Sequence, residues 1–219
     1  MKKNTTTMLL GLLLGLCLFT PRGFAQGEYE IGALGLISDY TSLTVSNSAQ
    51  SGTVGPAFGF SGGFLLGQTM SNRWGGEFRY VYFRNDLELD TGSASAELGG
   101  QSHAIHYDVL YYFSDADSRV RPYVAAGFGM KFYQGTGSED PFQPGSNLAL
   151  LTKTGEALPA GDFGVGVKWR IGRRAMFRLE FRDYITGVPS KVIAAAPGAE
   201  IDSNILHHWA PFFGITWTF

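Results

Sequence analysis

Long apolar runs are nearly absent from this sequence. The one clear run is the twelve-residue segment Met8–Phe19, which is shorter than the about 20 apolar residues that a membrane-spanning helix needs. It follows Lys2 and Lys3 and precedes the small residue Ala25, the pattern of a secretory signal peptide. We therefore expect a signal peptide over residues 1–25 and no helical membrane span in the mature chain.

Cysteine is almost absent too. Cys17 is the single cysteine, and it lies inside the apolar run behind the bulky Leu16 rather than after a small residue, which argues against lipid attachment. Removal of the signal peptide would remove this thiol as well. The mature chain would then have no disulfide and no thiolate metal site, and we expect neither a bound metal nor a cofactor.

The chain also lacks an excess of basic residues. Without the signal peptide, 14 basic and 19 acidic side chains remain, a net charge of −5. This balance gives no indication of nucleic-acid binding. The remaining residues, 26–219, are enough for one domain.

Helical periodicity is nearly absent, and alternation with a period of two takes its place. In the last segment, Ile205–Phe219, the odd positions are almost all large and apolar, whereas most even positions are small or polar. Such a pattern predicts a strand with one apolar face. Eight segments of the chain, this one included, show the alternating pattern: 28–40, 56–68, 73–88, 102–113, 119–135, 162–171, 177–185 and 205–219.

The connections between these segments alternate between long and short. Four loops, 41–53, 89–101, 136–158 and 189–203, contain 13 to 23 residues each, and three turns contain about three to five. Long outer loops, short periplasmic turns and an even strand number are typical of barrels that cross the outer membrane. The sequence thus predicts an all-β fold, an eight-stranded antiparallel up-and-down transmembrane β-barrel.

The first segment is less regular than the others. Leu34 and Leu36 fall on its otherwise polar row. A β-bulge would explain these positions, and the register of this strand stays open.

The chain ends on Gly214-x-x-Trp217-x-Phe219. This ending resembles the C-terminal signal by which bacterial outer-membrane barrels are recognised for insertion. The whole mature chain resembles the eight-stranded outer-membrane barrels, the class that includes the OmpA transmembrane domain and OmpX-like proteins. The resemblance implies a location in the bacterial outer membrane, contact with its lipid, and recognition by the barrel assembly machinery. Because the chain ends on its last strand, peptidoglycan anchoring is not expected.

Ionisable residues fall on the row opposite the aromatic residues, and His106 and Asp162 share that row. In an eight-stranded barrel the interior is just wide enough for side chains, so these charges should pair with one another and close the lumen. The predicted lumen charge network contains Glu77, Arg79, Asp108, Arg121, Lys131, Lys168, Arg170, Arg178, Glu180 and Arg182.

The fold leaves several functions open. We expect a structural or surface-interaction role, with an unknown extracellular ligand held by the four long loops. The alternatives are a narrow channel or carrier for a small or hydrophobic solute, favoured if the apolar tract Leu148–Leu151 lines a mouth, and a lipid A modifying enzyme. The enzyme is disfavoured because Trp209, not a serine, follows His207 and His208. The outward aromatic rows and charged interior also argue against a soluble lipocalin-like barrel.

Overall fold

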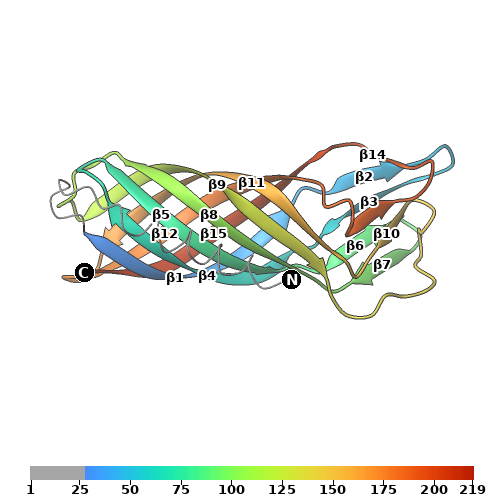
Figure 1. Cartoon of the computed structure of the whole chain (residues 1–219), viewed down its shortest axis with the longest axis horizontal. Helices are drawn as coiled ribbons and strands as arrows, with labels where there is room; N and C mark the ends of the chain where they lie inside the picture. Colours follow the sequence, from blue (N-terminus) through green and yellow to red (C-terminus); the bar gives the residue numbers. More distant parts are fainter. Residues whose placement is uncertain (1–27) are drawn as a thin grey trace, which may run out of the picture.

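The computed structural model describes residues 28–219, so the signal-peptide prediction falls outside the described part of the chain. Eight antiparallel strands form a closed barrel in which β1 pairs with β15 on one side and with β4 on the other (Figure 1). No helix within residues 28–219 is long and apolar enough to cross a membrane. The barrel strands are β1 (Tyr29–Tyr40), β4 (Gly59–Thr69), β5 (Trp74–Arg84), β8 (Gly100–Tyr112), β9 (Val120–Gly135), β11 (Gly155–Arg170), β12 (Ala175–Gly187) and β15 (Ile205–Thr218).

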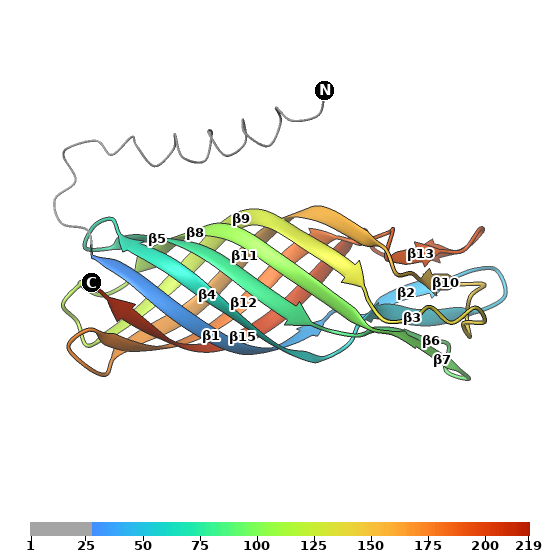
Figure 2. The ribbon, with the colours of Figure 1, turned by 60° about the horizontal axis from the view of Figure 1, so that its bottom comes forward.

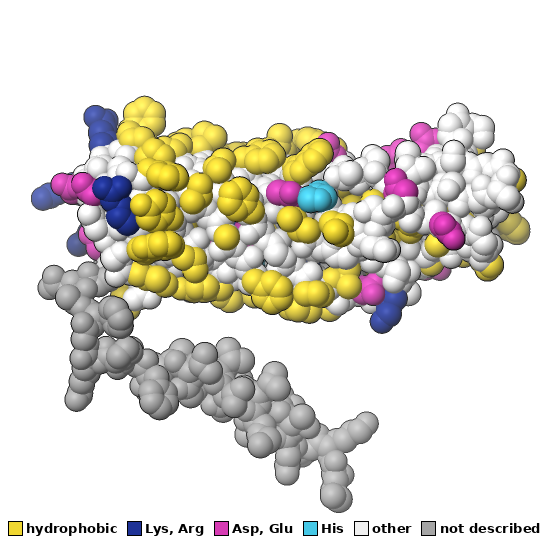
Figure 3. Space-filling view, turned by 90° about the horizontal axis from the view of Figure 1, so that it is seen from above, with side chains coloured by type: hydrophobic (Ala, Val, Ile, Leu, Met, Phe, Trp, Pro, Cys, Tyr) yellow, Lys and Arg dark blue, Asp and Glu magenta, His cyan; other side chains and the backbone are white. Residues whose placement is uncertain are grey.

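The two faces of each barrel strand differ as the alternation predicts. On β15, Phe213 and Trp217 are about half exposed, whereas Phe212 and Thr216 on the opposite face are buried. The outward rows of the strands carry exposed apolar side chains, which cover much of the barrel face seen in Figure 3, as a lipid-facing surface requires. The predicted all-β eight-stranded barrel is confirmed.

β1 contains no bulge, so a bulge does not explain its inward leucines. β1 pairs in continuous register with β4 and with β15 over the segment that contains Leu34 and Leu36. Both leucines point inward and pack in an apolar cluster with Val81, Phe83 and Phe212. The lumen is therefore not polar throughout, and an apolar side chain on the inward row does not require a change of register.

Neighbouring short turns contact each other at the periplasmic end of the barrel. Asn72 and Arg73, in the turn after β4, both contact Asp115 in the turn after β8, at 2.8 and 3.0 Å. Arg121 donates a hydrogen bond to the backbone oxygen of Asn72, at 3.1 Å. These contacts join neighbouring turns across the rim of the barrel.

The four long loops are not irregular, which corrects the prediction of a polar loop at 41–53. They contain further strands that form a cap beyond the barrel (Figure 2). A five-stranded sheet has the order β14-β2-β3-β6-β7, and a two-stranded sheet pairs β10 with β13. The bounds are β2 (Leu43–Ser46), β3 (Ser51–Pro56), β6 (Leu87–Asp90), β7 (Ser95–Leu98), β10 (Ala149–Leu151), β13 (Ile193–Ala195) and β14 (Glu200–Ile201).

The cap has an apolar core of fifteen buried side chains, which includes Leu43, Leu89 and Ile193. Three of the fifteen, Tyr40, Tyr133 and Leu206, come from the outer ends of barrel strands. It also takes up most of the tract Leu148–Leu151, in which only Leu150 is exposed. The tract therefore packs inside the cap rather than lining a mouth. The core holds the loops in one arrangement, since each cap strand buries one of its faces against it.

Candidate functional site

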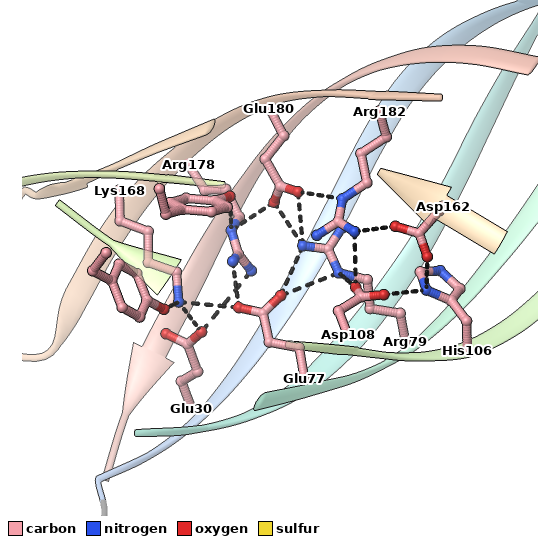
Figure 4. Close-up of polar contacts among 12 residues, drawn as sticks. Glu30, Glu77, Arg79, His106, Asp108, Asp162, Lys168, Arg178, Glu180 and Arg182 are labelled. Atoms are coloured by element: carbon pink, nitrogen blue, oxygen red, sulfur yellow. Dashed lines mark hydrogen bonds and ion pairs between the residues drawn. The ribbon is translucent and has the colours of Figure 1, made fainter. Parts of the chain in front are cut away.

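The barrel interior contains a continuous stack of paired charges (Figure 4). Its ten members come from β1, β5, β8, β11 and β12, and each is at most 7% exposed. We call this group the ion-pair stack: Glu30, Glu77, Arg79, His106, Asp108, Asp162, Lys168, Arg178, Glu180 and Arg182.

Arg79 lies at the centre of the stack. Its Nη2 atom is 2.8 Å from carboxylate oxygens of both Glu77 and Glu180, and its Nε atom is 3.1 Å from Asp108 Oδ2. Arg178 bridges the same two glutamates, with Nε 2.6 Å from Glu180 Oε1 and a direct contact to Glu77. The planar guanidinium groups therefore hold carboxylates that come from different strands of the barrel wall.

The two ends of the stack are closed differently. Towards the periplasm, Lys168 contacts Glu30, lies 3.0 Å from Glu77 Oε1 and donates a hydrogen bond to Tyr112 Oη at 2.7 Å. Towards the cap, His106 Nδ1 lies 2.7 Å from Asp108 Oδ1 and 3.1 Å from Asp162 Oδ2.

The stack holds five carboxylates against four arginine or lysine side chains. A proton on His106 would supply the fifth positive charge, and its position between two carboxylates is suited to an imidazolium.

Seven of the ten predicted network residues meet in the stack. Within residues 28–219, Arg121, Lys131 and Arg170 form no ion pair, which corrects their placement in one network. Arg121 and Arg170 lie near the periplasmic rim and donate to the backbone oxygens of Asn72 and Ala116.

Lys131 lies at the other end of the lumen, away from every carboxylate of the stack. Its Nζ atom is 3.0 Å from Tyr40 Oη and 2.5 Å from His208 Nδ1, and it lies 4.6 Å from the centre of the Phe83 ring. Aromatic rings and an imidazole thus surround this amine. Its partners could not be read from the sequence because they depend on the height of each residue along the lumen.

Sequence reasoning missed Glu30, which contacts Lys168. The signal was present, since Glu30 lies on the inward row of β1. The leucines further along that row obscured it.

His207 and His208 point to opposite sides of the barrel wall. His207 Nδ1 lies 2.7 Å from Asp183 Oδ2 on the outward face, whereas His208 is buried beside Lys131. The two imidazoles therefore do not converge on one ion. In the described residues one group has metal-like spacing, His106 with Asp108 and Asp162. Arg79 and Arg182 already contact its carboxylates, so this group does not fit a further cation.

Gly127 on β9 makes room for the stack. A Cβ atom at this position would overlap the carboxylate oxygens of Asp108 and Asp162. Gly127→Ala should therefore destabilise the barrel by about 1–3 kcal/mol, the usual cost of overpacking a filled interior. Urea unfolding in detergent measures this, with Gly161→Ala on β11 as the matched control, because a Cβ there would make only an ordinary contact, 4.0 Å from the backbone oxygen of Gly127. Equal stability of the two variants would contradict a tightly filled lumen.

The C-terminal motif lies where β15 closes the barrel. The backbone groups of Tyr29 and Phe219 exchange two hydrogen bonds, of 2.9 and 3.2 Å. Trp217 and Phe219 face outward and are well exposed, whereas a Cβ at Gly214 would meet the backbone oxygen of Ala33. The two aromatic rings of the motif are thus accessible at the periplasmic end, and its glycine permits close approach to β1.

Comparison with known proteins supports the fold. The family model of the outer membrane protein beta-barrel domain matches residues 8–206. A search of curated proteins gave no match. Among solved structures, the chain is similar to Neisserial surface protein A, with a TM-score of 0.54, 14% identity, and coverage of 89% of this chain and 99% of that one.

Two further solved structures are similar at low identity. The outer membrane protein OprG from Pseudomonas aeruginosa has a TM-score of 0.54 and 14% identity, with 88% and 96% of the two chains covered. Ail of Yersinia pestis, in complex with the heparin analogue sucrose octasulfate, has a TM-score of 0.50 and 11% identity, with 89% and 99% covered. The chain belongs to the outer membrane protein beta-barrel family and is a small barrel of the bacterial outer membrane.

Proposed function

We propose that this protein is a surface-interaction protein, in which the barrel is a closed membrane anchor and the cap is the binding part. The observation that carries the proposal is the apolar core of the cap, which is distinct from the apolar cluster inside the barrel. A cap built only to cover the barrel mouth would need no second core, whereas a rigid, preorganised surface binds at a lower entropic cost.

The filled interior supports the same proposal. Ion pairs join residues from five strands across the lumen, and an apolar cluster with Leu65, Phe83 and Phe212 fills the space beside them. A path for a solute would require these pairs to separate in a medium where unpaired charges are costly. The channel or carrier therefore remains the weaker candidate, because the tract Leu148–Leu151 packs in the cap core.

We also propose that the protein is not an enzyme. The pair of His207 and Asp183 on the outward face has the form of a base with its orienting carboxylate. Trp209, not a serine, occupies the next outward position on the same strand. The pair lacks the nucleophile that lipid hydrolysis by a triad requires.

The proposal for the binding role can be tested by removing most of the cap, the four strands β2, β3, β6 and β7 of its larger sheet. Bacteria would display either the whole protein or a variant in which residues 43–56 and 87–98 are each replaced by a short Gly-Ser turn. We expect the whole protein to promote attachment to epithelial monolayers or matrix-coated surfaces, and the variant to lose that attachment at an equal outer-membrane level. Equal attachment by the two proteins would overturn the proposal.

Partner recognition during assembly gives a further prediction. We propose that Gly214, Trp217 and Phe219 are recognised by the barrel assembly machinery, which the accessible aromatic rings support. Phe219→Ala should lower the amount of protein in the outer membrane several-fold while barely changing its stability after refolding in detergent. Phe163→Ala, an exposed lipid-facing phenylalanine on β11, is the control. If Phe219→Ala and Phe163→Ala lower the amount in the outer membrane equally, the loss would reflect reduced hydrophobicity of the lipid-facing surface and not recognition of the C-terminal motif.

A further inference from the structure

The five-stranded sheet of the cap has one apolar face and one acidic face. Its inward side chains, such as Leu43, Val54 and Leu89, pack in the cap core. Its outward side chains are serine, threonine, glycine, aspartate or glutamate. The residue just after β14 is an aspartate too. We call this surface the acidic sheet face: Glu88, Asp90, Glu97, Glu200 and Asp202.

The strands of this face carry no basic residue, and the nearest one along the chain is Arg84, three residues before β6. The cap segments 41–58, 85–99, 136–154 and 188–204 contain eight acidic residues and two basic ones. Both basic residues lie beside the second sheet, since Lys153 follows β10 and Lys191 precedes β13. In Figure 3, basic side chains gather mostly at the opposite, periplasmic end of the barrel. The acidic sheet face therefore has no cation of its own to balance it among the strands that form it.

Two carboxylates of the face lie directly opposite one another. Glu88 on β6 is the cross-strand partner of Glu97 on β7. Side chains at such positions are about 5 Å apart at Cβ, and like charges there are destabilising. A local conflict of this kind is expected where a sequence serves function rather than stability. It is relieved when a positive group binds between the two carboxylates.

A hollow adjoins the face where the cap meets the barrel. Its volume is about 290 Å³, and its lining includes Asp39, Thr53, Phe58, Glu88 and Asp90. Phe58 is 55% exposed, so it offers an apolar wall beside three carboxylates. A lysine or arginine side chain combines an apolar stem with a charged end, and that combination matches this lining.

Resting on the surface-interaction role proposed above, we infer that the acidic sheet face binds an extended segment of another protein that carries lysine or arginine at alternate positions. Glu88 and Asp90 are two residues apart on one strand. Alternate side chains of an extended partner have the same spacing, about 6.6–6.8 Å. The same charge would repel a polyanionic saccharide from this face.

The test measures binding of a synthetic peptide of five Lys-Thr repeats to the full mature protein in phosphatidylcholine nanodiscs. The variant Glu88→Gln/Asp90→Asn removes two charges from the face. Its matched control, Glu139→Gln/Asp140→Asn, removes two charges from the exposed loop before β10. We expect the first variant to bind about tenfold more weakly at low salt and the control to bind within about twofold of the wild type.

Several results would overturn the inference. Binding weakened equally by the two variants would mean that only net charge matters. The face would be a cation site if the peptide does not bind and Ca²⁺ raises the melting temperature of the wild type. In that case Glu88→Gln/Asp90→Asn would abolish the rise. A change from monomer to dimer that depends on the same residues would assign it to a second copy of the chain.

The attachment assay separates this inference from the proposed function. If removal of the cap abolishes attachment but Glu88→Gln/Asp90→Asn leaves it intact, the cap binds its partner elsewhere and only the inference fails. If removal of the cap has no effect, the proposed function fails. Loss of attachment in both variants supports both.

Discussion

Replacing Arg79 with methionine is expected to lower the free energy of unfolding by about 3–5 kcal/mol, the usual cost of breaking a buried ion pair. Methionine preserves much of the volume but leaves Glu77, Glu180 and Asp108 without the guanidinium that contacts all three. These carboxylates are at most 4% exposed, so water cannot replace the lost partner. Equilibrium urea unfolding in detergent micelles measures the change.

Arg84→Met on the same strand is the matched control. Arg84 is exposed at the outer end of β5, so its replacement should change the stability by less than about 0.5 kcal/mol. The double variant Arg79→Met/Glu180→Gln should be less destabilised than the sum of its single variants, because the two residues contact each other. If Arg79→Met were as stable as Arg84→Met, the stack would not hold the barrel together.

Replacing Leu89 with alanine is expected to destabilise the cap by about 2–5 kcal/mol, the range for a large-to-small change in a packed core. Leu89 is fully buried in the cap core between the two sheets. The barrel should be unaffected because its strands continue to pair around the full circle. Hydrogen exchange resolved by segment measures this, with faster exchange expected in β2, β3, β6 and β7 but not in the barrel strands.

Leu150→Ala is the control within the same cap. Leu150 is 41% exposed on β10, so its truncation leaves little cavity. Unfolding of the barrel together with the cap in the Leu89 variant would show that the two are one cooperative unit and would contradict this prediction.

The sequence predicted the barrel well because lipid imposes a simple rule on it. A strand in a membrane must pair on both sides, so the alternation on β15 implies closure as well as a strand. The cap strands show the same alternation, as in Leu43 and Val45 on β2. Each cap strand contains only a few residues within a polar segment. An alternation this short also arises by chance in loops, so it does not predict a strand.

The charged interior was predictable in kind but not in its pairing. Alternation indicates which side chains point inward, whereas the partner of each depends on its height along the barrel. Lys131 and Arg121 are both inward residues of β9, yet one lies among aromatic rings and the other at a turn carbonyl. Those surroundings come from strands and a turn far away in the sequence.

The most direct test of a closed lumen is single-channel conductance of refolded residues 26–219 in planar bilayers. It should be recorded beside Asp108→Asn/Glu180→Gln, which neutralises two carboxylates of the stack. The ion-pair stack and the capped mouth predict that the wild type is electrically silent and that the variant is less stable. Discrete wild-type conductance steps that change in the variant would contradict this account and make the charged interior a transport path.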